Sequence, residues 1–369
     1  MSLDARREEV LRALRTVQDP DLHRDLVSLG MIQELKIEDD RVSFAIVLTT
    51  PACPVRDSLK DQSDQAVKAL PWVRSVTIAM DASTRTSRGM GGEQLIPNVK
   101  NVIAVASGKG GVGKSTTSVN VALALADTGA KVGLLDGDIY GPNIPLMMGL
   151  KEKPQLQSEG GKIIPCRSYG IRLMSIGFFL NEDKPVIWRG PMVHGAIQQF
   201  LRDVDWGDLD YLVIDLPPGT GDAPLSLSQL IPLSGAVIVT TPQDVALQDV
   251  AKGMAMFRQL EVPLLGVVEN MSYFICPGCS ERHNIFGEGG GARIADQFGV
   301  PFLGKVPLQQ RVREGGDSGR PVVVTHPDSP EAAAFREVAG AIAQQVSILA
   351  VAGAGQGAFV PALTLTLKK

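Results

Sequence analysis

The sequence lacks several features that would place it in familiar classes of protein. No apolar run is long enough and free enough of charge to cross a bilayer, so we expect no membrane span. The opening residues, MSLDARREEVLRALR, are charged throughout and lack the apolar core of a signal peptide. With a formal net charge of −4, the chain has no strong positive field, so neither nucleic acid nor a membrane surface is an expected partner.

Cysteine is scarce as well. The 369 residues include four cysteines, Cys53, Cys166, Cys276 and Cys279, which do not suggest a disulfide framework. A reduced compartment fits this usage better, and we therefore expect a cytoplasmic protein. The length is sufficient for one large α/β domain and a smaller unit.

The most informative stretch is VIAVASGKGGVGKSTTSVN, residues 102–120. An apolar, β-branched run that predicts a buried strand leads into Gly-x-x-x-x-Gly-Lys-Ser, and a helical pattern resumes at Thr116. Glycines in such a loop let backbone N–H groups curl around phosphate, and the following helix adds its positive N-terminal end. The predicted nucleotide-binding residues of this loop are Gly108, Lys109, Gly110, Gly111, Val112, Gly113, Lys114, Ser115 and Thr116.

Three side chains of the loop have predicted chemical roles. Lys114 is placed to reach the β- and γ-phosphates, and the Ser115 hydroxyl to ligate Mg²⁺. Lys109 is an additional cation next to the first glycine, where it repels Lys114 unless phosphate is bound. We therefore expect Lys109 to act on the nucleotide as well. A glycine-rich turn that binds nothing is the alternative.

Residues 1–81 predict a separate small α+β unit. Apolar residues at helical spacing precede Asp19-Pro20-Asp21, which ends that helix. Two alternating segments, IQELKIE and RVSFAIVLT, predict a hairpin, and a helix near 55–70 and a strand over 73–80 complete the unit. Cys53 lies at the start of the second helix, where the helix dipole should lower the pKa of its thiol; a small buried side chain is the alternative.

The rest of the chain predicts a linker, a large domain and a tail. Residues 82–97 are polar and aperiodic, which is typical of a linker. Over residues 98–350, strands alternate with helical stretches, which predicts a P-loop α/β domain with a mostly parallel sheet flanked by helices. A helical stretch over 331–347 leads to a tail, residues 351–369, whose end alternates like an edge strand or is disordered. The predicted strands after the first are KVGLLDGD, LDYLVIDLPPG, GAVIVTTP and LLGVVENM.

Candidate site residues follow the carboxyl ends of these strands, the edge at which ligands bind in parallel sheets. Asp215 ends LVID and is a predicted Mg²⁺ ligand, directly or through water. Of the next pair, Asp136 and Asp138, one is predicted to ligate the metal or its water and the other to position the attacking water; a turn or helix cap is the alternative for both. The chain has no N-K-x-D guanine-reading motif, which favours ATP, and the Asn270 amide is placed to read adenine unless it only ends a turn.

Cys276 and Cys279 form a Cys-x-x-Cys pair in a loop after the strand LLGVVEN and supply two thiolates on one tight turn. Cys53 belongs to another domain and Cys166 to a different region, while His283 is near enough to be a third ligand but a fourth is missing. A two-fold dimer in which each chain gives two cysteines closes the site most simply. A Cys₂His-type zinc site, a redox dithiol and an incidental pair are alternatives, and spacing alone does not separate zinc from iron–sulfur.

The motifs, taken together, point to a family. In this order, GKGGVGKST, DGDIYGPNIP, DLPPGTGD and VENMSYFICPGC closely resemble the Mrp/ApbC-type iron–sulfur cluster carrier ATPases, a branch of the deviant Walker A ATPases. The likeness covers roughly residues 98–345. The N-terminal unit, with its TTPACP turn, is similar to the small PaaD/SufT-type domain of iron–sulfur cluster assembly.

This resemblance implies an ATPase that carries a labile [4Fe–4S] cluster across a homodimer and delivers it to apo iron–sulfur proteins, with cluster scaffold proteins as further partners. It implies that Lys109 reaches the partner subunit's nucleotide and that Cys276 with Cys279 bridges the cluster. It also implies that Asp138 positions water, which leaves Asp136 as the predicted Mg²⁺ ligand.

Other functions remain as alternatives. A ParA/MinD-like positioning ATPase would call for a basic amphipathic C-terminal helix or a basic surface, and the tail ALTLTLKK is neither. An electron-passing reductase is disfavoured, because the resemblance would then require cluster cysteines far apart in sequence. A zinc-binding P-loop ATPase is a further alternative.

Overall fold

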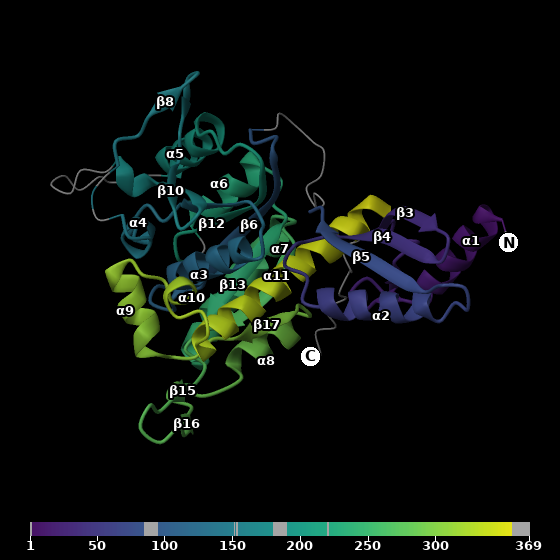
Figure 1. The fold of residues 1–369 in the computed structure, drawn as a ribbon. Helices are drawn as coiled ribbons and strands as arrows, with labels where there is room; N and C mark the ends of the chain where they lie inside the picture. The colour runs from purple at the N-terminus through teal and green to yellow at the C-terminus, as the bar shows by residue number, and fades with distance from the viewer. Residues whose placement is uncertain are drawn as a thin grey trace, which may run out of the picture.

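The computed structural model describes residues 2–84, 95–150, 152, 154–179, 190–219 and 221–355. Within these ranges the chain forms a small N-terminal α+β unit and a larger α/β unit (Figure 1). The predicted fold class is therefore confirmed. Most of the expected linker lies outside the described residues, and so does the end of the predicted tail, including ALTLTLKK.

The larger unit is built on one sheet, in which the described residues contribute eight strands in the order β10-β11-β7-β12-β6-β13-β14-β17. Neighbouring strands are parallel except for the antiparallel pair β10–β11 at one edge. The strands are β6 (Val99–Ser107), β7 (Val132–Asp136), β10 (Cys166–Ser168), β11 (Ile171–Ser175), β12 (Leu209–Asp215), β13 (Gly235–Thr240), β14 (Leu264–Glu269) and β17 (Phe302–Lys305).

The five strands that the sequence predicts for this sheet are all present, as β6, β7, β12, β13 and β14. In β6 nearly every residue is buried, because helices cover both faces of the sheet and leave no polar side to alternate with. Strands β10, β11 and β17 were not predicted; β10 and β17 are short and form the two edges of the sheet, and β11 lies next to β10.

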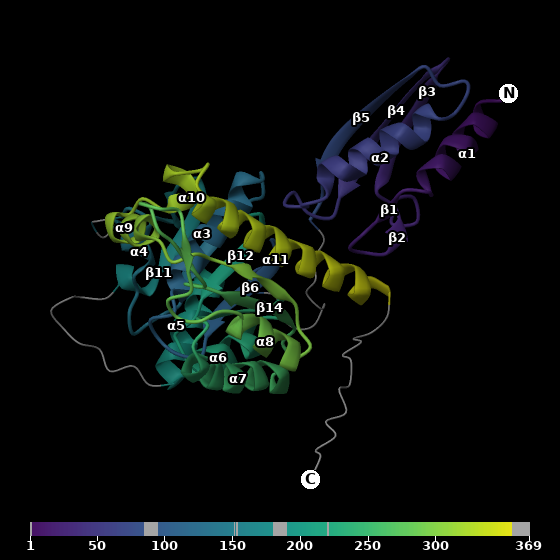
Figure 2. The same ribbon diagram turned by 90° about the horizontal axis from the view of Figure 1, so that it is seen from below.

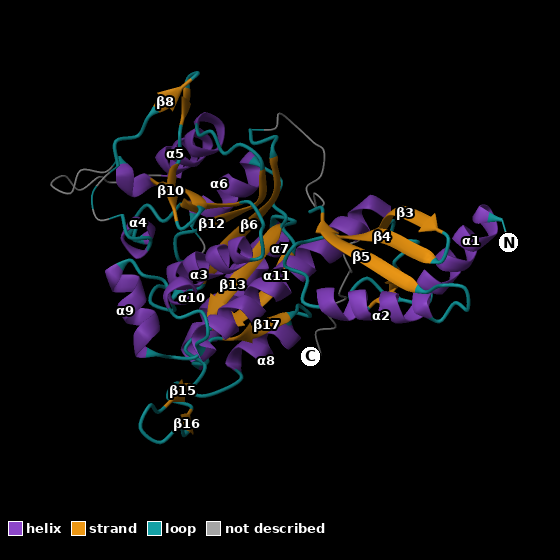
Figure 3. Ribbon diagram, viewed as in Figure 1, coloured by secondary structure: helices purple, strands orange, loops and turns teal. Residues whose placement is uncertain are grey.

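Helices pack on both faces of the sheet (Figures 2 and 3). Two apolar clusters form the core, one on each face. No helix in the described part of the chain is both long and apolar enough to span a membrane. One face carries α3 (Lys114–Asp127), α10 (Val322–Thr325) and α11 (Pro330–Gly355); the other carries α5 (Gly190–Asp203), α6 (Asp222–Leu230), α7 (Asp244–Gln259) and α8 (Gly290–Gln297).

Short elements complete the larger unit. Helix α4 (Ile144–Met147) packs against α9 (Gln310–Ser318), and the two lie close together in Figure 1. The remaining elements are the 3₁₀ turn η1 (Ile176–Phe178), the ladder of β8 (Ser158–Glu159) with β9 (Lys162–Ile163), and the hairpin of β15 (Phe274–Ile275) with β16 (Arg282–His283).

The N-terminal unit has the predicted helix–hairpin–helix–strand order. Strands β3 and β4 pair antiparallel through a turn at Asp39, and β4 and β5 pair parallel, with α2 as the connection between them. Helices α1 and α2 and the three strands share one apolar core. The elements are α1 (Leu3–Leu14), β1 (Gln18–Asp19), β2 (Arg24–Asp25), β3 (Ile32–Glu38), β4 (Arg41–Leu48), α2 (Arg56–Lys68) and β5 (Ser75–Ala82).

Helix α11 joins the two units, and it is longer than the sequence predicts. The apolar pattern predicts a helix to residue 347, whereas the helix continues to Gly355 and so enters the predicted tail. The extension has a partner, because Val351 packs against the core of the N-terminal unit. The Gln344 amide donates to Asp21 at 2.5 Å, and the Thr50 and Tyr211 hydroxyls share a buried hydrogen bond of 2.7 Å.

Candidate functional site

The glycine-rich loop connects β6 to α3, as predicted. Gly111 and Gly113 adopt positive φ angles of 81° and 80°, a backbone conformation that L side chains rarely adopt. Gly108 is required for a different reason: a Cβ there would lie 2.4 Å from the backbone nitrogen of Val250 in α7. The loop therefore has the curvature and the close packing that place backbone N–H groups around an anion.

A cavity of about 530 Å³ opens beside this loop. Predicted residues line part of it, while the rest of the wall comes from Asn143 and α4, from the segment after β17 and from α9. Asn143 and the start of α4 lie in the motif DGDIYGPNIP, whereas the segment after β17 and α9 carry no motif and have only their place after a strand end as a signal. The wall residues that were not predicted are Asn143, Leu146, Met147, Pro307, Leu308, Gln309, Val312, Arg313, Gly316 and Asp317.

Lys114 is the centre of a buried polar network. Its Nζ lies 2.7 Å from Asp215 Oδ2 and 3.4 Å from Asp138 Oδ2. Ser115 Oγ donates to Asp215 Oδ2 at 2.6 Å, and Ser118 Oγ donates to the other carboxylate oxygen at 2.6 Å. The structure thus brings together four residues that the sequence predicted, and adds Ser118, one turn further along α3.

The two neighbouring acids Asp136 and Asp138 lie in different surroundings. Asp138 lines the cavity, and burial raises the pKa of its carboxyl while Lys114 opposes that shift. Asp136 is fully buried, and burial together with Asp215 raises its pKa to about 8. Its oxygens accept hydrogen bonds from Ser175 Oγ at 2.9 Å and from the backbone N–H groups of Asp138 and Ile144. These are the contacts of the cap that was its alternative; its role as a Mg²⁺ ligand remains a prediction.

Asn270 follows β14 and lines the cavity. Its Nδ2 donates to the backbone oxygen of Val112 at 2.9 Å, so the amide braces the glycine-rich loop. The next residue, Met271, also lines the cavity and has a positive φ of 53°, which turns the chain away from the sheet. Asn270 is therefore at the predicted place, with a structural contact that sequence alone does not reveal.

Lys109 lines the cavity from the loop's outer part and is half-exposed. Its backbone oxygen accepts a hydrogen bond from Ser107 Oγ at 3.0 Å. Among the described residues its ammonium group forms no ion pair, in contrast to Lys114. The side chain is thus available to a ligand at the mouth of the cavity.

Cys276 and Cys279 lie in the turn of the β15–β16 hairpin, which projects from the larger unit at the bottom of Figure 1. Cys279 is exposed and Cys276 half-exposed. Hydrogen bonds from the backbone N–H groups of Cys279 and Gly278, and from the Cys279 side chain, lower the pKa of the Cys276 thiol. Backbone bonds from Cys276 to Glu281 and from Ser280 to Cys276 close the turn, at 2.9 Å and 2.8 Å. The predicted tight turn with two adjacent thiols is therefore present.

The base of this hairpin is hydrogen-bonded to the wall of the cavity beside the glycine-rich loop. The backbone N–H of Leu308 donates to Tyr273 at 2.7 Å, and the side-chain amide of Gln309 donates to the Ile275 carbonyl at 3.1 Å. Both Leu308 and Gln309 line the cavity, and Ile275 immediately precedes Cys276. A hydrogen bond thus links a residue of the cavity wall to the residue next to Cys276.

The other two cysteines lie elsewhere. Cys166 is in β10, at the opposite edge of the sheet from β17, the strand that leads to the hairpin's hydrogen-bond partners. Cys53 precedes α2, but burial raises the pKa of its thiol to about 11, and Asp19 and Asp21 add to that shift. The expected lowering by the helix dipole is therefore wrong, because desolvation of the thiolate outweighs it.

Comparison with known families now places the chain. Residues 98–343 match the model of the NUBPL iron-transfer P-loop NTPases, and residues 7–79 match that of an iron–sulfur cluster assembly protein. The first match alone spans more than half of the sequence. The chain belongs to the NUBPL iron-transfer P-loop NTPase family. The predicted family and its N-terminal assembly domain are both confirmed.

Individual relatives agree with this placement. An iron–sulfur cluster carrier protein of Synechocystis is 51% identical over 348 residues, which cover 93% of this chain and 99% of that one. Its counterpart in Deinococcus radiodurans is 48% identical and covers 92% of this chain and 96% of its own. A nucleotide-binding protein from Archaeoglobus fulgidus, solved in complex with ADP and with cobalt found in it, is 41% identical with a TM-score of 0.56. That likeness covers 63% of this chain and 90% of the other.

Proposed function

We propose that this family member binds and hydrolyses ATP and carries a labile [4Fe–4S] cluster, bridged between two copies, for delivery to apo iron–sulfur proteins. One observation supports this above the others: the wall of the phosphate-loop cavity is hydrogen-bonded to the residue that precedes Cys276. A nucleotide-dependent carrier requires its nucleotide site to be connected to its thiolate pair, and this hydrogen bond provides such a connection. Relatives named as iron–sulfur cluster carriers add support.

The cavity suits a nucleoside polyphosphate with its metal. The glycine-rich loop and Lys114 would hold the phosphates, and Lys114 would neutralise charge that grows on the β- and γ-phosphates during hydrolysis. Ser115 and Asp215 offer a hydroxyl and a carboxylate 2.6 Å apart, and such hard oxygen donors fit Mg²⁺. When bound there, Mg²⁺ would neutralise part of the phosphate charge. The absence of a guanine-reading motif and the position of Asn270 favour ATP.

Two further residues are assigned roles in hydrolysis. Asp138 lines the cavity within 3.4 Å of Lys114, so its carboxylate is placed to orient a water molecule against the terminal phosphate. Lys109 lies at the mouth of the cavity and would reach the nucleotide of a second copy. A homodimer with the two cavities facing one another would use both residues.

The cluster itself is the cargo. Each chain offers the two thiols of Cys276 and Cys279, whereas a cluster with four cysteine ligands needs two pairs. A two-fold dimer supplies them and places both turns near its axis. Exposed ligands on a turn suit transfer to apoproteins and loading from a scaffold protein. A positioning ATPase leaves this hairpin without a role.

Anaerobic reconstitution with iron and sulfide, followed by transfer to a test apoprotein with and without ATP, tests the proposal. We expect the absorption of a [4Fe–4S] cluster and about two irons per chain. Cys276→Ser and Cys279→Ser should lose the cluster and the transfer activity but keep basal ATP hydrolysis, because the turn is outside the cavity. Cys166→Ser is the matched control and should retain both. A chain that takes up no iron, or a monomer that holds a full cluster, would contradict the proposal.

A further inference from the structure

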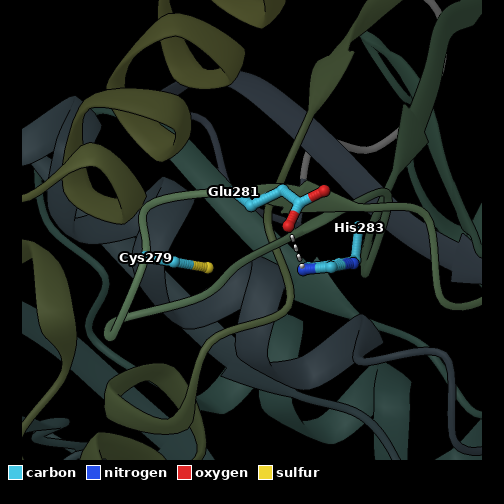
Figure 4. A group of neighbouring side chains, drawn as sticks. All are labelled: Cys279, Glu281 and His283. Atoms are coloured by element: carbon cyan, nitrogen blue, oxygen red, sulfur yellow. Dashed lines mark ion pairs between the residues drawn. The ribbon is translucent and has the colours of Figure 1, made fainter.

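The cysteine hairpin carries two more side chains that can bind metal. Donor atoms of Cys279, Glu281 and His283 all lie within 4.8 Å of one another, and Figure 4 shows the three side chains grouped beside the turn. We propose that each hairpin is a mononuclear site for a divalent transition-metal ion of the Zn²⁺ or Fe²⁺ class. Its ligands are Cys279, Glu281 and His283, all from one chain, with the fourth position open to water.

The hairpin's geometry explains why these side chains converge. Residues 281 and 283 are two positions apart on an extended segment, so their side chains point to the same face. Glu281 Oε2 lies 3.8 Å from His283 Nε2 (Figure 4). The cation between them, Arg282, points elsewhere: it stacks over the Tyr273 ring at 4.1 Å and pairs with Glu288 at 2.7 Å. Among these neighbours, therefore, no positively charged side chain lies where it would repel a metal ion bound to Glu281 and His283.

The donor set selects the class of metal. Thiolate, imidazole and carboxylate together are ligands of Zn²⁺ and related ions, whereas Mg²⁺ and Ca²⁺ take oxygen ligands. In a tetrahedral site the ligand atoms are roughly 3.3–3.8 Å apart, given metal–ligand distances of about 2.0–2.3 Å. The group must therefore contract slightly. Glu281 and His283 can do so because their side chains are 69% and 47% exposed.

This site differs in kind from the proposed cluster. It draws its three protein ligands from one chain and needs no dimer, but it uses Cys279, one of the two cysteines of the proposed cluster. A hairpin that holds a single ion is thus unavailable for bridging a cluster, and the two states exclude one another. The inference does not depend on the proposed function, because it concerns Glu281 and His283, which have no part in a cluster bridged by cysteines.

Cobalt titration of the full-length protein tests the site. Chelator-treated, reduced protein is titrated anaerobically with Co²⁺, and the thiolate-to-cobalt and tetrahedral ligand-field absorptions are followed together with the oligomeric state. We expect one Co²⁺ per chain, in monomer as well as dimer. Glu281→Gln and His283→Gln should each weaken Co²⁺ binding by on the order of 10- to 100-fold. The matched controls Glu314→Gln and His326→Gln alter exposed residues outside the hairpin and should bind Co²⁺ as the wild type does.

Two results would overturn the inference. One is a stoichiometry of one Co²⁺ per two chains; the other is unchanged affinity in both Glu281→Gln and His283→Gln, since the cysteines alone would then hold the ion. Circular dichroism of each variant confirms that the fold is intact. Reconstitution of the iron–sulfur cluster in the same variants separates the two proposals: cluster formation should survive both substitutions. Failure of the wild type to form any cluster would count against the proposed function and leave the mononuclear site standing.

Discussion

Lys114, which lines the cavity beside the glycine-rich loop, and its ion-pair partner Asp215 have side chains that are 6% and 0% exposed. Glu281 and His283, on the cysteine hairpin, are 69% and 47% exposed. In the first region each charged group is held by several partners before any ligand arrives. In the second, the candidate ligands share one turn and have few partners. The same chain thus combines a preorganised site with an adaptable one.

Because of this difference, the two sites would respond differently to a ligand. Breaking a buried ion pair by removing one partner is costly, because the remaining charge is left without compensation in a desolvated place. An exposed turn reorganises at little cost, since its side chains exchange protein contacts for water. Stabilisation of a transition state needs the first arrangement. Cargo that has to be released needs the second.

Removing the central charge of the buried site should have the largest effect. Lys114→Ala deletes the cation that balances Asp215 and would stabilise phosphate charge, so ATP hydrolysis should fall by roughly 10²–10³-fold. Steady-state ATPase assays measure this, with the exposed Lys252→Ala as the control for loss of a lysine. Cluster reconstitution should persist, because the hairpin is separate. Wild-type turnover in Lys114→Ala would remove the basis for the proposed phosphate site.

Thiol chemistry contrasts two half-exposed cysteines whose surroundings differ. The pKa of Cys276 is lowered by N–H donors, whereas burial raises the pKa of Cys53 to about 11. At pH 7 the thiolate fraction of Cys53 is then about 10⁻⁴, so in the metal-free protein alkylation of Cys276 should be faster by roughly 10² or more. Below its pKa, each pH unit should accelerate alkylation of Cys53 about tenfold. Mass spectrometry of the labelled peptides measures both rates. Equal rates at pH 7 would show that desolvation does not disfavour the Cys53 thiolate in solution.

Lys109 lines the cavity beside the buried site and is itself half-exposed. Lys109→Ala should leave nucleotide binding largely intact, because Lys114 already serves the bound phosphates. It should lower hydrolysis at least about tenfold, because a cation that would act on the nucleotide is lost. If Lys109 acts in trans, mixing this variant with Asp138→Ala restores one intact site per mixed dimer. A one-to-one mixture should then recover about a quarter of wild-type activity. No recovery at any ratio would mean that each subunit works alone.

The sequence predicts the buried region better than the exposed one, for physical reasons. Strands such as β6 and β12 contain continuous apolar runs, and the glycine-rich loop has a fixed spacing, so both can be recognised from the sequence alone. The contact of Asn270 with Val112 depends on the order of strands in the sheet, so it cannot be recognised from the sequence alone. The pKa of Cys53 was mispredicted because a helix start is visible in sequence and desolvation is not.

The exposed hairpin shows the other limit. Cys276 and Cys279 were recognised because two cysteines at this spacing are rare by chance in such a chain. Glu281 was missed, since a single acid in a polar loop carries no pattern, and only the hairpin places it beside His283. The cavity wall from Pro307 to Arg313 was missed for the same reason, because it contains no motif and acquires its role from the position of β17.

The smallest expected effect concerns the contact between the two regions. Gln309 lines the nucleotide cavity and donates to the Ile275 carbonyl at 3.1 Å, so a nucleotide that shifts this wall should alter the cysteine turn. We expect ADP to change the alkylation rate of Cys279 in the metal-free wild type. Loss of one hydrogen bond of about 0.5–1.5 kcal/mol in Gln309→Ala should reduce that nucleotide effect by about 2- to 10-fold.

The adjacent Gln310→Ala is the matched control, because the Gln310 amide bonds to Glu314 on α9 at 2.5 Å and not to the hairpin. Nucleotide affinity measured in parallel shows whether Gln309→Ala acts through binding alone. An undiminished ADP effect in Gln309→Ala, or no ADP effect in the wild type, would mean that the buried site and the exposed hairpin are not coupled through this bond.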